Sequence, residues 1–227
     1  MEWTIGWWQI SIQRVWPTNE QLTQMYNMVA PSWHRLIQCL GVSRAYAQLF
    51  QSLEQEGVLT HLQDNSTICD CGIGTAAFSL ALAQTVPIRL NITGVDISPT
   101  MLQVAYQNLH QLGVKAQICH GNVKDLPFSD NTFDLVMSAH MLEHLPEPEV
   151  GLREMVRVLR PSKPLILALT RRGLLGSLIQ WHWGNSCLES KTLTQMMTHA
   201  GLTNIGFHPL TIGLSQYTSI VCLGFKP

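Results

Sequence analysis

The sequence of 227 residues is long enough for one sizeable α/β domain with a modest cap. A formal net charge of −1 provides no basic field, which argues against binding to nucleic acid. Charged residues make up 13% of the chain, against roughly 25% in an average soluble domain, and hydrophobic residues make up 46%. A surface poor in charge follows, which favours an oligomer interface, a lipophilic substrate or loose membrane contact without choosing among them.

No segment has the features of a targeting signal or of a membrane span. Residues 1–8 lack the positive region of a cleaved signal peptide, and no apolar run approaches the roughly 20 residues that cross a bilayer. The six cysteines form no Cys-x-x-Cys pair. Cys69, Cys71, Cys119 and Cys222 fall in predicted strands, where cysteine behaves as a small buried apolar residue. These patterns predict a reducing, cytoplasmic location.

The first part of the chain, residues 1–60, is predicted to be a helical cap that belongs to the same domain as the rest. Leu22, Met25, Tyr26 and Val29 recur at helical spacing, and Pro31 is expected to stop that helix before a second one follows. Residues 61–227 are predicted to form the core of the domain, with 171–187 as a substrate-side insertion.

Tryptophans crowd two segments of the chain. They are Trp3, Trp7, Trp8 and Trp16 near the N-terminus and Trp181 and Trp183 in the predicted insertion. The spacing of Trp3, Trp7 and Trp8 is helical and would let one helix face enter a membrane surface. However, Arg14 is the only cation in the first thirty residues, which is a poor match for anionic lipid. Packing and lid formation are therefore favoured over a membrane anchor, an aromatic substrate pocket or a dimer contact.

The run from Ile68 to Ala76 predicts a strand, a tight turn and the start of a helix. Apolar residues lead to Asp70, Gly72 and Gly74 alternate with other residues, and 75–83 have helical character. Glycine is needed where the backbone bends sharply or approaches a ligand without a Cβ in the way. On its own this pattern would also fit a dinucleotide site.

The elements that follow alternate in a way typical of a parallel sheet covered on both faces. A second strand, 88–95, ends on Asp96, whose carboxylate is placed to hold both hydroxyls of a ribose. Ser98 suits the cap of the next helix and Pro99 its first position. Further strands are predicted at 114–119, 133–138 and 165–169, a helix at 191–200, and an antiparallel pair at 204–212 and 217–224 joined by a short turn.

Six blocks of the sequence share the order and spacing of a known family. They read Asp70-x-Gly72-x-Gly74, Val95-Asp96-x-Ser98-x-x-Met101-Leu102, Leu126-Pro127-Phe128, Phe133-Asp134-Leu135-Val136, Leu142-Glu143-His144-Leu145 and Arg153-Glu154-x-x-Arg157-Val158-Leu159-Arg160-Pro161. Over residues 60–170 the chain resembles class I S-adenosylmethionine-dependent methyltransferases, in the branch that includes quinone C-methyltransferases and small-molecule methyltransferases. The resemblance implies a Rossmann-like fold with a seven-stranded, mostly parallel sheet, an antiparallel last strand, and N-terminal helices over the cofactor cleft.

The resemblance also implies that S-adenosyl-L-methionine is the cofactor, that S-adenosyl-L-homocysteine is the product, and that no metal is needed. Gly72 and Gly74 would run along the methionine part of the cofactor in a loop ordered by Asp70. Asp96 would hold the ribose hydroxyls. The other implied contacts are Ile97 and Met101 beside the adenine, Asn122 and Val123 at its polar edge, and Ala139 with His140 beside the methionine part.

The sequence departs from the family pattern at three places. Ala76 stands where the loop usually has a third glycine, a small replacement that should leave binding intact. Asn122 replaces the usual aspartate, which keeps a hydrogen-bond acceptor and adds a donor. Residues 162–164 replace the glycine pair that usually precedes the fifth strand, which should alter a turn and not the chemistry.

Two histidines that follow the fourth strand are the candidate catalytic residues. Methyl transfer needs the reacting atoms in line, and it needs a general base only where the nucleophile must lose a proton. If 140–144 is helical, His140 and His144 share one face, with Glu143 between them. In several resembled families a histidine at the position of His144 is the base, oriented by a nearby acid, so His144 is the first candidate and His140 the second. The spacing also suits a metal, but no further ligand cluster supports one.

The predicted function is methyl transfer to a small, apolar acceptor of the aromatic, isoprenoid or specialised-metabolite kind. The alternatives are a quinone or lipid C-methyltransferase at a membrane surface and a cofactor-binding accessory protein without turnover. A nucleic-acid partner is not expected, since residues 138–141 lack the Asn/Asp-Pro-Pro-aromatic signature of base methylation. Membrane contact, homo-oligomerisation and the identity of the methylated atom stay open.

Overall fold

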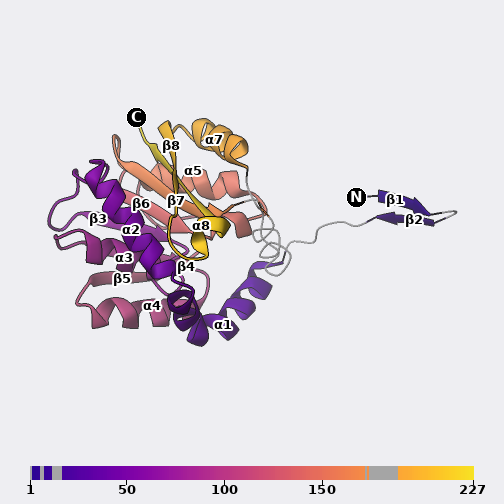
Figure 1. Ribbon diagram of the computed structural model, residues 1–227, viewed down its shortest axis with the longest axis horizontal. Helices are drawn as coiled ribbons and strands as arrows, with labels where there is room; N and C mark the ends of the chain where they lie inside the picture. Colours follow the sequence, from indigo (N-terminus) through magenta and orange to yellow (C-terminus); the bar gives the residue numbers. More distant parts are fainter. Residues whose placement is uncertain (1, 6–7, 12–16, 172, 174–188) are drawn as a thin grey trace.

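The central feature of the computed structural model, which describes residues 2–5, 8–11, 17–171, 173 and 189–227, is a seven-stranded sheet (Figure 1). Its strands are β3 (Thr67–Cys71), β4 (Asn91–Asp96), β5 (Lys115–His120), β6 (Leu135–Ala139), β7 (Pro164–Thr170), β8 (Thr203–Pro209) and β9 (Ser219–Phe225). They are ordered β5-β4-β3-β6-β7-β9-β8. Neighbours from β5 to β7 are parallel, whereas β9 runs antiparallel to both β7 and β8. The predicted sheet, with its last strand reversed, is confirmed.

Helices cover both faces of this sheet, as predicted, because successive strand residues point to opposite faces. Ile166 and Ala168 of β7 belong to the core shared with α2 (Val42–Gln55), α3 (Ala77–Thr85) and α4 (Pro99–Gln111). Leu165 and Leu167 belong to the core on the other face, shared with α5 (Pro148–Val158) and α7 (Ser190–His199). The sheet therefore lies between two helical layers (Figure 1).

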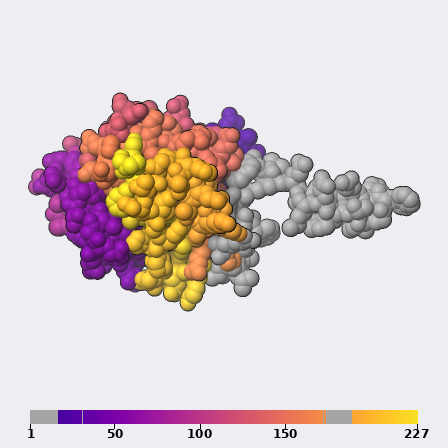
Figure 2. Space-filling view, turned by 90° about the horizontal axis from the view of Figure 1, so that it is seen from above, coloured from indigo at the N-terminus to yellow at the C-terminus, as the bar shows by residue number. Residues whose placement is uncertain are grey.

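The segment that joins β8 to β9 lies against α2. In Figure 2 the yellow C-terminal residues border the purple residues of α2. Thr211 Oγ1 donates a hydrogen bond of 2.6 Å to Gln48 Oε1, and Gly213, with a φ of 65°, bends beside Leu40. The segment includes a short helix, α8 (Ser215–Thr218), where the sequence predicts a turn and the start of a strand. This helix brings Ser215 to the edge of the sheet where the parallel strands end.

The first long helix, α1 (Asn19–Cys39), is longer than the sequence predicts. Thr18 and Gln21 form a capping box at its start, and the helix continues through Pro31, which was expected to stop it. Proline removes one intrahelical hydrogen bond, but packing can outweigh that loss. The buried side chains of Leu22, Ala30 and Ile37 supply this packing on both sides of the proline.

The N-terminal stretch forms a β-hairpin, so the prediction that residues 1–60 are helical throughout is wrong there. β1 (Glu2–Ile5) pairs antiparallel with β2 (Trp8–Ser11), and Ile5 lies opposite Trp8. Tryptophan, isoleucine and threonine favour strands, so local preference explains the outcome. Trp7, Trp16, Trp181 and Trp183 lie outside the described residues, as does the predicted insertion from 174 onward and residue 172.

Candidate functional site

A cavity of about 640 Å³ lies where the parallel strands end. Strand ends β3, β4, β6 and β7 supply its floor, while α1, α2 and α8 supply walls. All eleven site residues predicted from the sequence line it: Asp70, Gly72, Gly74, Asp96, Ile97, Met101, Asn122, Val123, Ala139, His140 and His144. Ligands of open α/β sheets bind at this edge. Residues up to 74 positions apart in sequence are thus gathered at one site.

The two glycines of the β3–α3 loop are glycines for different reasons. Gly72 has a φ of 72°, and a Cβ there would lie 2.3 Å from Met141 Cγ. Gly74 has a φ of 53°, and a Cβ there would meet no atom within 4 Å. Gly72 is therefore required by packing within the protein. At Gly74 the backbone is open to the cavity, so a ligand can lie against it.

Asp96 ties the glycine loop to the helix that follows β4. Its Oδ2 accepts the N–H of Gly74 and its Oδ1 accepts the N–H of Ser98, both at 2.9 Å. Ser98 caps α4 by accepting the N–H of Met101, as predicted. Burial raises the pKa of the Asp96 carboxyl, although the backbone N–H groups of Ser98, Gly74 and Ile97 act in the opposite direction.

Asp70 lies beneath the loop and is almost completely buried. Its Oδ2 accepts a hydrogen bond of 2.6 Å from the Ser79 hydroxyl on α3. Burial raises the pKa of Asp70 to about 7; the hydrogen bond from Ser79 opposes this shift and the nearby Asp96 carboxylate adds to it. Asp70 therefore joins β3 to α3 and changes its charge near neutral pH.

Asn122 lies at the opposite end of the cavity from β7 along the sheet, after β5. Its side-chain oxygen accepts the N–H of Lys124 at 3.0 Å, and its backbone oxygen accepts the N–H of Asp125. This turn uses one lone pair of the side-chain oxygen and leaves the amide NH₂ group available to a ligand. Val123 is buried beside it and also lines the cavity.

His140 and Glu143 form a polar cluster in which Glu143 is 1% exposed. The Glu143 carboxylate accepts hydrogen bonds from the backbone N–H and the hydroxyl of Thr170, and its Oε1 lies 3.3 Å from His140 Nδ1. Burial by itself raises the pKa of Glu143, but the hydrogen bond and charge of His140, with the bonds from Thr170, outweigh it and hold the pKa below its ordinary value. An ionised Glu143 only accepts, so in the neutral form of the His140 ring the proton is expected on Nδ1.

The other ring nitrogen of His140 therefore carries the lone pair of a base. His140 Nε2 lies 3.3 Å from the hydroxyl of Ser219, which donates to it. The His140 backbone has a left-handed φ of 54°, and its N–H donates to Ala168 O at 2.8 Å. Such a conformation costs of order 1 kcal/mol in a residue other than glycine and is concentrated at functional sites.

The expectation that His140 and His144 share a helix face is wrong. Only residues Leu142–His144 are helical, in a single 3-10 turn, and His140 precedes it in the left-handed conformation. The His144 ring makes an edge-to-face contact with Tyr26 of α1, with ring centroids 5.9 Å apart. The buried carboxylate of Glu143, which lies between the two histidines in sequence, contacts His140.

Sequence reasoning missed several polar residues at the β7 end of the cavity. These are Thr170, Ser215, Thr218 and Ser219. Thr170 is the last residue of β7, and its place at a strand end was the one available signal. The three others lie in the segment that was predicted as a turn and a strand.

The helix α1 is held over the cavity by polar contacts with the segment after β4. Thr23 Oγ1 donates to Ile97 O at 3.4 Å, and Ser98 Oγ donates to Asn27 Oδ1 at 2.7 Å. From the same helix Leu22, Tyr26 and Trp33 line the cavity. The predicted placement of the N-terminal helices over the cleft is thus seen for α1.

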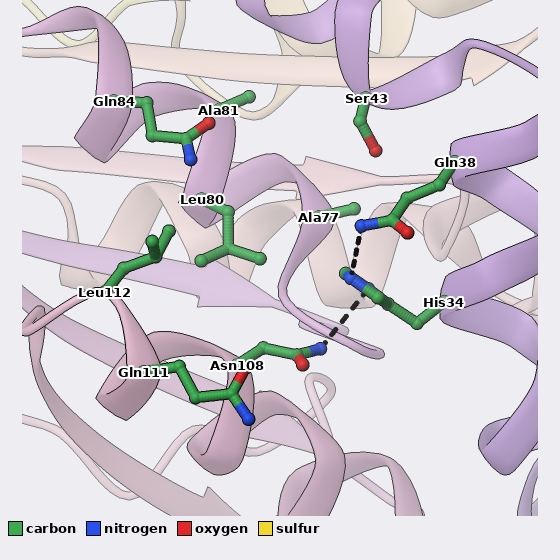
Figure 3. Close-up of a pocket in the computed structure, with 10 residues that line it drawn as sticks. All are labelled: His34, Gln38, Ser43, Ala77, Leu80, Ala81, Gln84, Asn108, Gln111 and Leu112. Carbon is green, nitrogen blue, oxygen red and sulfur yellow. Dashed lines mark hydrogen bonds between the residues drawn. The ribbon is translucent and has the colours of Figure 1, made fainter.

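A second, smaller hollow of about 230 Å³ lies on the outer side of the glycine loop, between α1, α3 and α4 (Figure 3). Asn108 Nδ2 donates to Thr75 O at 2.9 Å, so the amide is oriented to donate also to His34 Nδ1, 3.2 Å away. Burial lowers the pKa of His34, which favours the neutral ring that accepts this bond. Through Asn108, α1 is thus linked to the glycine loop.

Comparisons with known proteins agree on one family. A family model described as "Methyltransferase domain" matches residues 69–167. Demethylmenaquinone methyltransferase from Bacillus cereus is 31% identical over 194 residues, which cover 73% of this chain and 80% of that protein. The chain belongs to the class I S-adenosylmethionine-dependent methyltransferases. This methyltransferase is an enzyme that acts on a small molecule, in agreement with the prediction from sequence.

Solved structures with low sequence identity have the same fold as the methyltransferase. The [4+2]-cyclase SpnF matches with a TM-score of 0.73 at 19% identity, over 94% of this chain and 97% of the cyclase. A Haemonchus contortus phosphoethanolamine N-methyltransferase 2, in complex with phosphomonomethylethanolamine and S-adenosylhomocysteine, matches with a TM-score of 0.62 at 14% identity, over 77% and 52%. Because one neighbour is a cyclase, the fold alone does not give the reaction; the sequence relatives do.

The cavity of the methyltransferase suits a ligand with both polar and apolar parts. Gly74 is open to it, and the buried hydroxyl of Thr75 in the same loop has no hydrogen-bond partner among the described residues. A buried hydroxyl without a partner is uncommon in native structures. A polar ligand that passes along this loop would supply the partner.

Two searches of the described part of the chain found nothing. No group of three or more His, Cys, Asp or Glu residues there is arranged to hold a metal ion. No helix of that part is long and apolar enough to cross a membrane.

Proposed function

We propose that this cavity binds S-adenosylmethionine through the residues predicted from the sequence. Asp96 holds the ribose hydroxyls, since each of its carboxylate oxygens accepts one backbone N–H and retains a further lone pair. Asn122 offers its amide NH₂ group to the adenine, and the loop of Gly72 and Gly74 lies along the methionine part. The bound cofactor would supply a methyl carbon attached to a sulfonium. A nucleophile attacks that carbon from the side opposite the sulfur, and the thioether leaves.

Calorimetric titration with S-adenosylhomocysteine tests this assignment. The unaltered protein is expected to bind in the micromolar range, and Asp96→Ala to lose at least about tenfold in affinity because buried hydroxyls of the ligand lose a charged acceptor. Glu149→Ala, at an exposed acidic residue of α5 that does not line the cavity, is the control and should bind normally. Equal affinities for the Asp96 variant and the control would refute the assignment.

The acceptor in this proposal is a hydroxylated aromatic ring with an apolar substituent, of the quinol class, methylated on a ring carbon. Demethylmenaquinone methyltransferases from Bacillus cereus and Lactiplantibacillus plantarum are 31% and 32% identical to this chain. The cavity supports the same class, because most of its wall on the α1 and α2 side is apolar. The apolar wall residues are Leu22, Trp33, Leu36, Ile37, Leu40 and Val42.

His140 acts as the general base, and its contact with the buried Glu143 carboxylate at the cavity wall is the observation that carries this proposal. His140 Nε2 takes the proton of the ring hydroxyl, which leaves a phenolate and raises the electron density on the ring carbon beside it. Glu143 stabilises the imidazolium that forms. The ring carbon bonds to the methyl group, and the electron pair of the broken carbon–sulfur bond stays on sulfur. Water takes the proton from that carbon and His140 returns its proton to the ring oxygen, which restores the aromatic ring and the base.

Methyl transfer from labelled cofactor tests the acceptor class. Demethylmenaquinol, prepared by chemical reduction of the quinone, is expected to be methylated. Its new methyl group should survive hot hydroiodic acid, which cleaves aryl methyl ethers but not a methyl group on a ring carbon. A polar amine such as histamine serves as the control acceptor and should give no product. Transfer to the amine without transfer to the quinol would contradict the proposal, and transfer to the ring oxygen would correct the methylated atom.

A further inference from the structure

The short helix α8 brings hydroxyl groups to the end of the cavity that contains His140. Ser215, Thr218 and Ser219 line the cavity there, beside Leu214 and Tyr46. Two of these hydroxyls have partners within the protein. Thr218 Oγ1 donates to the backbone oxygen of Leu214, and Ser219 Oγ contacts His140 Nε2. The third hydroxyl, that of Ser215, differs from them.

Ser215 is only 2% exposed, and its hydroxyl has no hydrogen-bond partner among the described residues. Leaving a hydroxyl buried without a partner costs free energy, and native structures keep few such groups. Besides Ser215, the one other buried side-chain oxygen or nitrogen of this kind in the described part of the chain is the Thr75 hydroxyl, and it lines the same cavity. Thr75 belongs to the glycine loop at the proposed cofactor end, whereas Ser215 lies toward the α8 end, with His140.

The position of Ser215 relative to the base suggests what its partner would be. Ser215 is the first residue of α8 and Ser219 directly follows the helix, so the two are one helical turn apart, about 6 Å along the axis. Ser219 is in contact with His140 Nε2, which takes the first ring hydroxyl in the proposed function. An oxygen bound at Ser215 would therefore lie about one aromatic ring width from the ring hydroxyl at His140. One acceptor molecule could carry both oxygens.

We propose that the Ser215 hydroxyl binds a second oxygen of the acceptor and so selects rings with two oxygen substituents over rings with one. This inference rests on the proposed function, since it assumes that the first oxygen is the one deprotonated at His140. Ser215 is a specificity residue in this account and not a base, because a serine hydroxyl has no neighbouring base among the described residues to activate it. The hydroxyl can donate to a quinol oxygen or accept from its hydrogen.

The test compares two acceptors on two proteins. The acceptors are 1,4-dihydroxynaphthalene and 1-naphthol, which differ by one hydroxyl, and the proteins are the unaltered enzyme and Ser215→Ala. The variant is expected to lose about tenfold or more in kcat/KM with the dihydroxy ring and to keep its activity with 1-naphthol, since only the former loses a hydrogen bond. Ser190→Ala, on the exposed start of α7, is the control and should change neither value.

Thermal unfolding without ligand provides a second readout. Removing a hydroxyl that has no partner should leave the midpoint of Ser215→Ala at or above that of the unaltered protein. A lower midpoint would reveal a structural partner and overturn the inference. Equal losses with both acceptors, or a loss with neither, would also overturn it while leaving the proposed function intact. If the unaltered enzyme methylates neither ring nor demethylmenaquinol, the proposed function fails and this inference fails with it.

Discussion

At the scale of single residues, Asp70 makes the stability of the enzyme depend on pH. Burial raises its pKa from 3.8 to about 7, so the folded protein keeps a proton that the unfolded chain releases. Between those two values the folded state binds more protons, and stability falls as pH rises through this window.

Replacing Asp70 by Asn should remove that dependence while keeping a partner for Ser79. Between pH 5 and pH 8 the unaltered protein is expected to lose about 2–3 kcal/mol of unfolding free energy relative to Asp70→Asn. Urea unfolding at both pH values measures the difference. Asp64→Asn, at an exposed loop position, is the control and should differ from the unaltered protein by the same amount at both pH values. If Asp70→Asn also differed from the unaltered protein by the same unfolding free energy at both pH values, the buried carboxyl would be ionised over the whole range from pH 5 to pH 8.

The two histidines of the cavity can be separated by their effects on turnover. His140→Gln should lower kcat by about 10²–10⁴, the usual worth of a general base, and leave affinity for S-adenosylhomocysteine nearly unchanged. His144→Gln should cost less than about tenfold, since the buried acid contacts His140 and His144 packs on Tyr26. Single-turnover rates at saturating cofactor measure both. The reverse order of effects would restore His144 as the base.

At the scale of elements, the β3–α3 loop contains two glycines whose replacement should have different consequences. Gly72→Ala places a Cβ against Met141 and should destabilise the fold by about 1–3 kcal/mol. Gly74→Ala meets no atom and should cost about 1 kcal/mol through its positive φ, but its Cβ enters the cavity and should weaken S-adenosylhomocysteine binding at least tenfold. Urea unfolding and calorimetry on both variants would check the contrast; a clash-free Gly72→Ala would show that Met141 moves aside.

Another element-scale feature is the clamp by which α5 holds the loop before β6. Arg157 donates to the backbone oxygens of Leu126 and Phe128 and to the Glu154 carboxylate, which itself accepts the N–H of Leu126. Arg157→Leu should lower unfolding free energy by about 1–3 kcal/mol because these acceptors lose a charged donor. Arg153→Leu, on the exposed side of the same helix, should change it by less than about 0.5 kcal/mol. Similar losses for both would mean that the clamp contributes little.

At the scale of the whole molecule, ligand binding should reduce local opening most in α1. This helix lines the cavity and is tied to the segment after β4 by Thr23 and Asn27. A ligand that binds the folded state stabilises the elements that line its binding site. Hydrogen exchange in α1 is therefore expected to slow when S-adenosylhomocysteine is added, while exchange in α7, remote from the cavity lining, stays the same. Equal slowing in both helices would indicate a global effect only.

The sheet and the part of the cavity lined by Gly72, Gly74 and Asp96 could be predicted from sequence because their signals are local. Gly72 and Gly74 directly follow one strand and Asp96 ends another, so position along the chain gives position in space. The β7 end could not be predicted in this way. Glu143 binds Thr170, 27 residues later, and His140 meets Ser219, 79 residues later. No spacing rule connects such pairs.

The course of two segments could also not be predicted from sequence, because packing overrides local preference. Pro31 signals the end of a helix, yet the buried face of α1 carries the helix past it. The 140–144 segment has helical spacing, but it bends at His140 because the backbone N–H there bonds to Ala168 of the neighbouring strand. In both cases the deciding contact lies with another element.

The contact between Gly72 and Met141 also restricts how this site can change by descent. With the backbone as it stands, a Cβ at position 72 would lie 2.5 Å from the Cβ of residue 141, so side chains at both positions require the backbone to shift. The tolerance of position 72 therefore depends on residue 141. A chain with glycine at 141 should accept a side chain at 72 more easily than this chain does.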